Sequence, residues 1–125
     1  MRLLLDTHVY LWCLSDSPRL SKQAKARILQ AEEVFVSAAS IWEAAIKSAL
    51  GRLQVDPEAL ANGITASGYR ELPVTARHAA MAARLPLHHR DPFDRMLIAQ
   101  AIDEPMRLLT LDAALKPHSD LVVVI

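Results

Sequence analysis

The sequence predicts an α/β fold, a three-layer α/β/α sandwich with helices on both sides of a central, mostly parallel sheet. Short apolar segments alternate along the chain with longer segments of helical character, and this alternation is typical of a parallel sheet whose strands are joined by helices. Hydrophobic residues make up 52% of the 125 residues, which is enough for a continuous core. The length suits one domain, so we expect residues 1–125 to form a single unit.

Two strands and four helices are predicted in the first half of the chain. Leu3, Leu4 and Leu5 form an apolar run that ends at an acidic residue, as is typical of a short buried strand. Ser21 is a favourable residue at the start of a helix, and Gly51 is a favourable residue just after the end of one. In chain order, we expect a strand at 3–5, helices at 7–14 and 21–30, a strand at 34–36, and helices at 38–50 and 56–67.

The second half of the chain alternates in the same way. Gly68 and Pro73 bound a weakly predicted strand, and Pro86 ends the helix that follows it. Asp91 and Pro92 match the preferred start of a helix, with an acidic cap and a proline in the first turn. We therefore expect a strand at 69–72, a helix at 75–85, a polar loop at 87–90, a helix from 91 to about 102, and strands at 108–109 and 121–125.

Composition and charge exclude several classes of protein. The chain carries 14 Lys and Arg against 14 Asp and Glu, so it is formally neutral and does not hold nucleic acid through bulk charge. Its single cysteine, Cys13, cannot form an internal disulfide. No apolar run approaches the roughly 18 residues of a membrane span, and the N-terminal residues do not have the pattern of a signal peptide. We therefore expect a cytoplasmic protein that does not bind a membrane.

Acidic residues lie just after the predicted strands or near the start of neighbouring helices. Asp6 follows the first strand directly, and Glu43 lies about two turns into the helix after the second strand. Asp91 and Asp94 begin the long helix that precedes the next-to-last strand, and Asp112 lies just past that strand. Because ligands of parallel α/β sheets bind at the carboxyl ends of the strands, we expect these acids to converge at one edge of the sheet.

A cluster of carboxylates predicts a divalent cation. The negative charges repel one another, and each carboxylate then resists ionisation unless a positive charge lies among them. Mg²⁺ prefers hard oxygen ligands and is usually held by a few carboxylates together with water and phosphate oxygens. The chain has no Cys/His spacing typical of zinc. Mg²⁺ or Mn²⁺ held by these acids could activate water to hydrolyse a phosphodiester, which would leave a 5′-phosphate and a 3′-hydroxyl.

Each acid also has an ordinary structural explanation. Asp6, Asp91 and Asp112 each precede a predicted helix and could serve as its cap. Glu43 and Lys47 are four residues apart on one helix, which is the spacing of a surface ion pair. Glu43, however, lies in a segment that is apolar almost all round, and a buried carboxylate there needs a partner. The residues alone leave both explanations open.

Four blocks of sequence carry a family resemblance: LLLDTH at 3–8, VSAASIWE at 36–43, DPFDRMLIAQA at 91–101 and LTLD at 109–112. They resemble the PIN-domain family, and within it the VapC-type toxins. The blocks occur in the family's order and span nearly the whole chain. The Asp-Pro-Phe-Asp-Arg stretch is the most specific of them, and it makes the resemblance more than a match of short apolar runs.

The resemblance implies an acidic Mg²⁺ or Mn²⁺ site in a PIN-like α/β sandwich. The family's four acids, which are the predicted catalytic and metal-binding residues, match Asp6, Glu43, Asp94 and Asp112. Asp91 is an extra acid of the Asp-Pro-Phe-Asp subgroup and is expected to cap a helix or to lie just outside the ligand set. Thr7 and Thr110 match small hydroxyl residues beside the acids, which can orient carboxylates or water.

The resemblance also implies a function and partners. Proteins of this kind are metal-dependent endoribonucleases, the toxins of toxin–antitoxin pairs, and they commonly form homodimers that a small antitoxin protein silences. One alternative is a receiver-like signalling domain, whose length and first acid are similar, but Thr7 and His8 follow Asp6 where receivers carry paired acids. Another alternative is a PIN-like binding module without catalytic activity.

A basic stretch is the predicted contact to the RNA substrate. No acidic residue occurs from Leu72 to Arg90, and Arg77 and Arg84 are seven residues apart, so they share one helix face. A solvated surface is the alternative explanation of this strip. The predicted contacts to RNA phosphates are Arg77, Arg84, Arg90 and Arg95.

Overall fold

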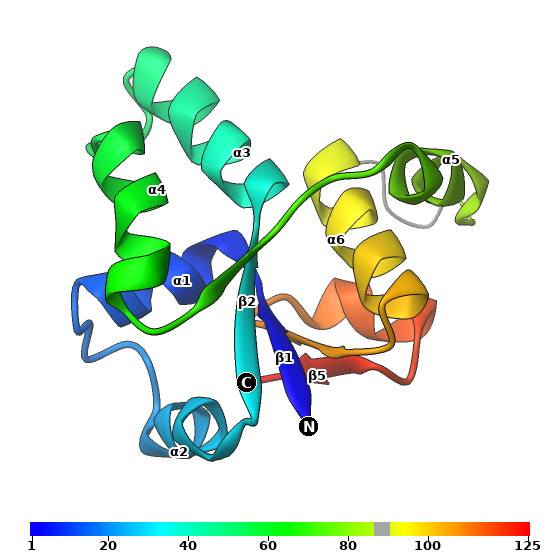
Figure 1. Ribbon diagram of the computed structural model, residues 1–125, viewed down its shortest axis with the longest axis horizontal. Coiled ribbons are helices and arrows are strands. Elements are labelled where there is room, and N and C mark those ends of the chain that lie inside the picture. Colours follow the sequence, from blue (N-terminus) through cyan, green and yellow to red (C-terminus); the bar gives the residue numbers. More distant parts are fainter. Residues whose placement is uncertain (87–90) are drawn as a thin grey trace.

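Five parallel strands form the centre of the computed structural model, which describes residues 1–86 and 91–125 (Figure 1). The strands lie in the order β3-β2-β1-β4-β5, and each neighbouring pair is parallel. The predicted parallel sheet is thus confirmed, whereas the loop predicted at 87–90 lies outside the described residues. The strands are β1 (Arg2–Leu5), β2 (Glu33–Ser37), β3 (Arg70–Leu72), β4 (Arg107–Thr110) and β5 (Val122–Val124).

Local sequence signals position the helices as expected. The side-chain oxygens of Ser21 and Ser37 accept hydrogen bonds from the backbone N–H groups of Ala24 and Ala39, and these bonds start two helices. Within the described ranges, no helix has the length and apolar character of a membrane span. The helices are α1 (Thr7–Leu14), α2 (Lys22–Gln30), α3 (Ala38–Ala49), α4 (Pro57–Ala66), α5 (Ala76–Arg84), α6 (Pro92–Asp103) and the 3₁₀ helix η1 (Ala113–His118).

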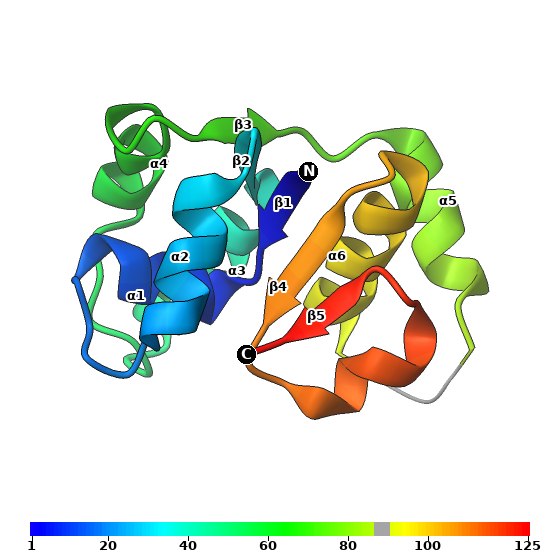
Figure 2. The same cartoon turned by 90° about the horizontal axis from the view of Figure 1, so that it is seen from below.

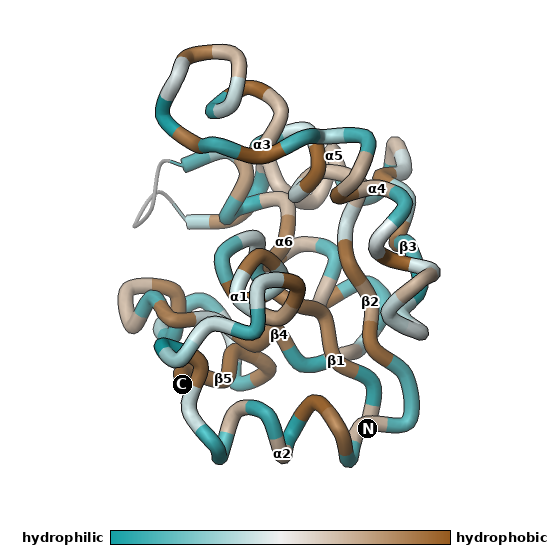
Figure 3. Tube along the Cα trace, turned by 90° about the vertical axis from the view of Figure 1, so that its left-hand side faces the viewer, coloured by the Kyte–Doolittle hydropathy of each residue, from teal (hydrophilic) through white to brown (hydrophobic). Residues whose placement is uncertain are grey.

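The sheet separates two hydrophobic layers. Along β1, Leu3 and Leu5 pack with side chains of α1, α2 and α4, whereas Leu4 between them packs with side chains of α6 and η1. Figure 2 shows the same arrangement, with α1, α2 and α4 on one side of β1 and with α5 and α6 on the other. In Figure 3 the strands β1, β2 and β4 are mostly hydrophobic, while α2 alternates in character as an amphipathic helix does. The predicted three-layer α/β/α sandwich is confirmed.

The register of the parallel strands brings their carboxyl ends to one edge. Leu5 of β1 lies opposite Val36 of β2 on one side and Leu109 of β4 on the other. The backbone N–H of Asp6 extends this pattern by donating to the carbonyl oxygen of Leu109 at 3.0 Å. Asp6 and Thr110, which are far apart in the sequence, therefore leave the sheet side by side.

A close contact between α1 and α4 fixes how these helices pack. The hydroxyl of Tyr10 donates a 2.6 Å hydrogen bond to the carbonyl oxygen of Leu60, and Tyr10 is 1% exposed. A Cβ atom added at Gly63 would lie 2.9 Å from that hydroxyl oxygen. The hydroxyl cannot easily move, because it is buried and hydrogen-bonded, so the contact requires glycine at position 63.

We therefore predict that Gly63→Ala lowers the free energy of unfolding by about 1 kcal/mol, since crowding of the buried hydroxyl outweighs the gain in helix propensity. In a Tyr10→Phe background the hydroxyl is absent, and the same substitution should be neutral or stabilising. Denaturant unfolding of the four proteins of this double-mutant cycle measures the coupling. Equal effects of Gly63→Ala in both backgrounds would contradict the packing described here.

Candidate functional site

The predicted acids meet in a pocket at the carboxyl edge of the sheet. The pocket has a volume of about 380 Å³ and lies between α1, α3, α6 and the segment that follows β4. Its lining therefore joins residues from both ends and the middle of the chain. It is lined by Asp6, His8, Glu43, Lys47, Asp91, Asp94, Leu111 and Asp112.

Asp6 directly follows β1, and a hydroxyl group holds its carboxylate in place. It is 8% exposed, and the hydroxyl of Thr110 donates to its Oδ2 atom at 2.6 Å. Burial raises the pKa of the Asp6 carboxyl, the hydrogen bond from Thr110 lowers it, and the nearby charge of Glu43 raises it again, with a net upward shift. A positive charge in the pocket would therefore stabilise the ionised form of Asp6.

Glu43 is a buried carboxylate with two partners. It is 5% exposed, and the hydroxyl of Thr7 donates to Oε1 at 2.7 Å while the ammonium of Lys47 donates to Oε2 at 2.8 Å. The hydrogen bond to Glu43 is the main reason why the pKa of Lys47 is raised, and the charges of Asp91 and Asp94 add to the shift. The predicted partner of the buried glutamate is therefore present, and the predicted ion pair lies inside the acidic pocket.

The remaining acids that line the pocket sit at helix starts. Oδ1 of Asp91 accepts hydrogen bonds from the backbone N–H groups of Phe93 and Asp94, so its expected role as a cap is visible. Oδ1 of Asp112 likewise accepts from the N–H of Ala114 and caps η1. Asp94 lies in the first turn of α6, where the helix dipole favours a negative charge.

The donor set of the pocket fits a divalent cation that prefers oxygen. Its carboxylates are hard ligands, two of them are buried and close enough to influence each other, and hydroxyl groups orient both. Asp6 follows β1, Glu43 lies on α3 and Asp94 lies on α6, and all three line one pocket. This arrangement suits Mg²⁺ or Mn²⁺ better than Zn²⁺, which favours nitrogen and sulfur ligands.

The family model of the PIN domain matches residues 3–119, a span that includes the pocket residues. The chain belongs to the PIN-domain family. It is 36% identical over 117 residues to ribonuclease VapC22 of Mycobacterium tuberculosis, and the match covers 92% of this chain and 90% of that relative. The family resemblance predicted from the four sequence blocks is therefore confirmed.

Solved structures show the same PIN fold at low sequence identity. One is the structure of VapBC2 from Rickettsia felis bound to a promoter DNA fragment, with a TM-score of 0.70, 14% identity and coverage of 100% of this chain and 98% of that chain. Another is a toxin–antitoxin complex from Klebsiella pneumoniae, with a TM-score of 0.68, 18% identity and coverage of 98% and 96%. At these identities the likeness establishes the architecture of this PIN domain.

The structure divides the predicted basic strip. α6 lies between α3 and α5, so Arg77 and Arg84 of α5 are separated from most of the pocket (Figure 1). Arg77 pairs with Asp103, near the end of α6 that is remote from Asp94. Arg84 lies exposed in the last turn of α5, at the same end of α6 as the pocket. Arg90 lies outside the described residues.

Arg95 has an internal role that sequence reasoning missed. Its side chain is buried, and its guanidinium donates to the carbonyl oxygens of Ala82, Leu85 and Pro86 at 2.7 to 2.9 Å. These carbonyl groups lie at and just beyond the end of α5, where a helix leaves its acceptors unpaired. The guanidinium is therefore used to join α5 to α6, and it does not face a substrate as the sequence suggested.

A cluster of His78, Asp103 and Glu104 resembles a metal site but does not fit one. Nδ1 of His78 accepts the backbone N–H of Thr75 at 3.1 Å, so the ring proton lies on Nε2. Nε2 donates to Glu104 at 2.8 Å, and Asp103 lies 3.3 Å away. Because both ring nitrogens are used, this cluster joins α5 to the end of α6 and offers no nitrogen lone pair to a metal.

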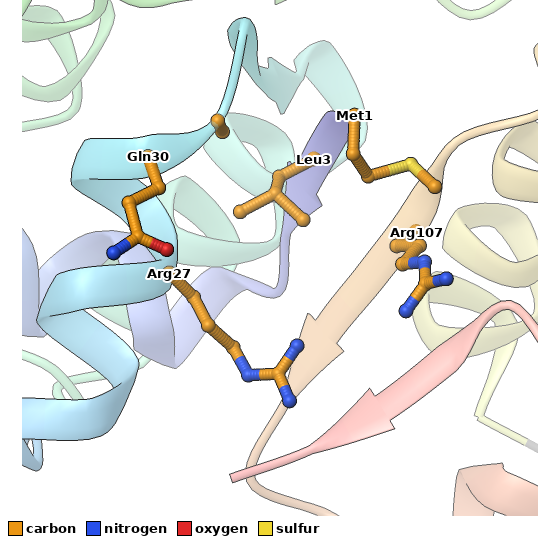
Figure 4. Close-up of a pocket in the computed structure, with 6 residues that line it drawn as sticks. Met1, Leu3, Arg27, Gln30 and Arg107 are labelled. Atoms are coloured by element: carbon orange, nitrogen blue, oxygen red, sulfur yellow. The ribbon is translucent and has the colours of Figure 1, made fainter.

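Another pocket of the PIN domain lies at the opposite end of the strands. It has a volume of about 320 Å³, and Arg107 at the start of β4 and Arg27 of α2 line it together with Met1, Leu3 and Gln30 (Figure 4). Among the described residues that line it there is no carboxylate, so it does not compete with the acidic pocket as a cation site.

We predict that His78→Ala separates stability from metal binding. The substitution removes a buried ring with its hydrogen bonds and should lower the free energy of unfolding by about 2 to 4 kcal/mol. Mn²⁺ affinity should not change, because the pocket lies at the other end of α6, roughly 18 Å away along a 12-residue helix. Calorimetric titration with Mn²⁺, well below the melting temperature, measures this; a loss of affinity would show that the His78 cluster binds the metal.

Proposed function

We propose that this PIN domain is a Mg²⁺- or Mn²⁺-dependent endoribonuclease that acts as the toxin of a toxin–antitoxin pair. The observation that carries the proposal is the pocket in which Asp6, Glu43 and Asp94 meet, with Asp112 on its rim. The similarity to a protein named ribonuclease VapC22 supports RNA as the substrate. The similarity of fold to toxin–antitoxin complexes supports the biological role.

In the proposed reaction the cation supplies the chemistry, and the residues of the pocket bind the cation and orient its ligands. When bound, the divalent cation lowers the pKa of a water nucleophile and offsets charge on the phosphodiester. Asp6, Glu43 and Asp94 are the proposed ligands, and Asp112 completes the negative rim. Thr110 and Thr7 hold Asp6 and Glu43 in fixed orientations through hydrogen bonds of 2.6 and 2.7 Å.

Arg84 is the exposed arginine that we retain as an RNA contact among the described residues. It lies at the end of α5 that adjoins the start of α6, and its charge is free to meet phosphates along the approach to the pocket. Arg90 remains a prediction from the sequence. Arg77 is paired with Asp103 and Arg95 is buried, so we do not retain them.

The two alternative functions are less well supported. The hypothesis of a receiver-like signalling domain was based on the chain length and on an acid after the first strand. Membership of the PIN-domain family argues against this hypothesis. A PIN domain without catalysis would have no need to keep carboxylates at mutually repulsive positions. In this chain the predicted acids line one pocket, and two of them are buried and oriented by hydroxyl groups.

We also propose two protein partners, an antitoxin and a second copy of the chain. The similar toxin–antitoxin complexes support the first. Support for a homodimer comes from Trp42, which is 64% exposed and lines an apolar pocket of about 490 Å³ with Val74, Phe93 and Met96. Cellular RNA as substrate implies that the protein acts in the cytoplasm.

We predict that Asp6→Asn, Glu43→Gln and Asp94→Asn each reduce the Mn²⁺-dependent cleavage of a structured RNA by about 100-fold or more, because each removes a charged ligand. Mn²⁺ binding should weaken in parallel, while circular dichroism shows an intact fold. Asp56→Asn is the control, because Asp56 is an acid at the start of α4 that does not line the pocket. RNA that stays intact with the unaltered protein, whichever divalent metal is added, would contradict the proposal.

A further prediction concerns Asp91, whose side chain both caps α6 and lines the pocket. Asparagine caps a helix as well as aspartate does, so Asp91→Asn should leave thermal stability nearly unchanged. If Asp91 only caps the helix, Mn²⁺ affinity should fall by no more than about threefold, from the loss of one nearby charge. A loss as large as that of Asp94→Asn would instead make Asp91 a ligand.

A further inference from the structure

Lys47 places a fixed positive charge inside the carboxylate pocket. It is the one Lys or Arg among the described residues that line this pocket, and its ammonium lies 2.8 Å from Oε2 of Glu43. The Lys47 side chain is 35% exposed, whereas that of Glu43 is 7% exposed. The pair therefore reaches from solvent into the interior, with the carboxylate at the buried end.

An ordinary surface ion pair does not account for this arrangement. Exposed pairs four residues apart on a helix contribute little, because water already solvates both charges. Here the carboxylate is buried, so without a positive partner it would be an uncompensated charge. Asp91 and Asp94 line the same pocket, and their charges, together with that of Glu43, raise the pKa of Lys47.

The two oxygens of Glu43 have different partners. Oε1 accepts a hydrogen bond from the neutral hydroxyl of Thr7, and Oε2 accepts one from the charged ammonium of Lys47. A dication that binds Glu43 attracts both oxygens but repels the ammonium. Lys47 and the dication therefore compete for Oε2 of Glu43.

We propose that Lys47 is an exchangeable counter-ion of the carboxylate pocket, which neutralises Glu43 when no divalent cation is bound and competes with that cation for Oε2. This inference rests on the proposed metal site. Lys47 is thereby a positioning residue, because it orients the buried carboxylate of Glu43 and balances its charge in the metal-free protein. The same competition limits the affinity of the pocket for the dication.

The test is a titration of the full chain with Mn²⁺, followed by the electron paramagnetic resonance of the free ion. Lys47→Met keeps the length of the side chain and removes its charge, and it should lower the Kd for Mn²⁺ by about tenfold, because a repulsive unit charge is lost near the dication. Lys47→Arg keeps the charge and should bind Mn²⁺ within about twofold of the unaltered protein. Lys47→Gln is a second uncharged variant, and it should also bind Mn²⁺ more tightly than the unaltered protein. It keeps the test possible if Lys47→Met does not fold.

Thermal unfolding gives a second readout that does not depend on catalysis. Without metal, Lys47→Met should melt at a lower temperature than the unaltered protein, since Glu43 loses its charged partner. Saturating Mn²⁺ should then raise the melting temperature more in the variant than in the unaltered protein. Lys25→Met is the matched control, because it breaks the exposed pair between Lys25 and Asp16, outside the pocket, and should change neither quantity.

The outcomes separate the inference from the proposed function. If the unaltered protein binds Mn²⁺ and Lys47→Met binds it equally or less tightly, the competition by Lys47 is wrong while the metal site stands. If neither protein binds Mn²⁺, the proposed metal site is wrong and the inference fails with it. Tighter binding by Lys47→Met and Lys47→Gln, but not by Lys47→Arg, supports the inference whether or not RNA is cleaved.

Discussion

Repulsion between carboxylates is the constraint on which the rest of the site depends. Because β2, β1 and β4 are parallel and in register, the segments that follow them carry Asp6, Glu43 and Asp112 to one edge of the sheet. α6 begins at the same edge on the other side of the sheet, and its first turn adds Asp94. Asp6 and Glu43 are buried there, and the charge of Glu43 helps to raise the pKa of Asp6. The strand arrangement that builds the core therefore also gathers negative charge, which favours a cation, at one edge of the sheet.

Neutral and charged groups of the chain stabilise these carboxylates in different ways. The hydroxyls of Thr7 and Thr110 each donate one hydrogen bond to a buried acid, which orients the acid without changing the net charge of the pocket. Lys47 supplies one positive charge from within the chain. The acids also gain from helix starts, because α6 places the carboxylate of Asp94 in its first turn. Hydrogen bonds and helix starts thus fix the positions of these carboxylates.

The sequence predicted best what local interactions decide. Helix caps and apolar runs determine where elements begin and end, and the observed ends differ from the expected ones by at most one residue. The acids could be assigned to one edge because parallel strands align their carboxyl ends. The role of Arg95 could not be predicted, because it depends on carbonyl groups at the end of another helix. The pairing of Lys47 with Glu43 was predicted, but its position inside the pocket depends on how α3 packs against α6.

The role of His78 could not be predicted from local sequence either, because its ring joins two helices through partners that are 3 and 26 residues away in sequence.

The most direct test of the central claim is an anomalous difference map from crystals of the protein soaked in Mn²⁺. A peak bounded by the carboxylates of Asp6, Glu43 and Asp94 is the predicted result. A map without a peak there, or with its main peak at His78, would contradict the account of these acids as a cation site.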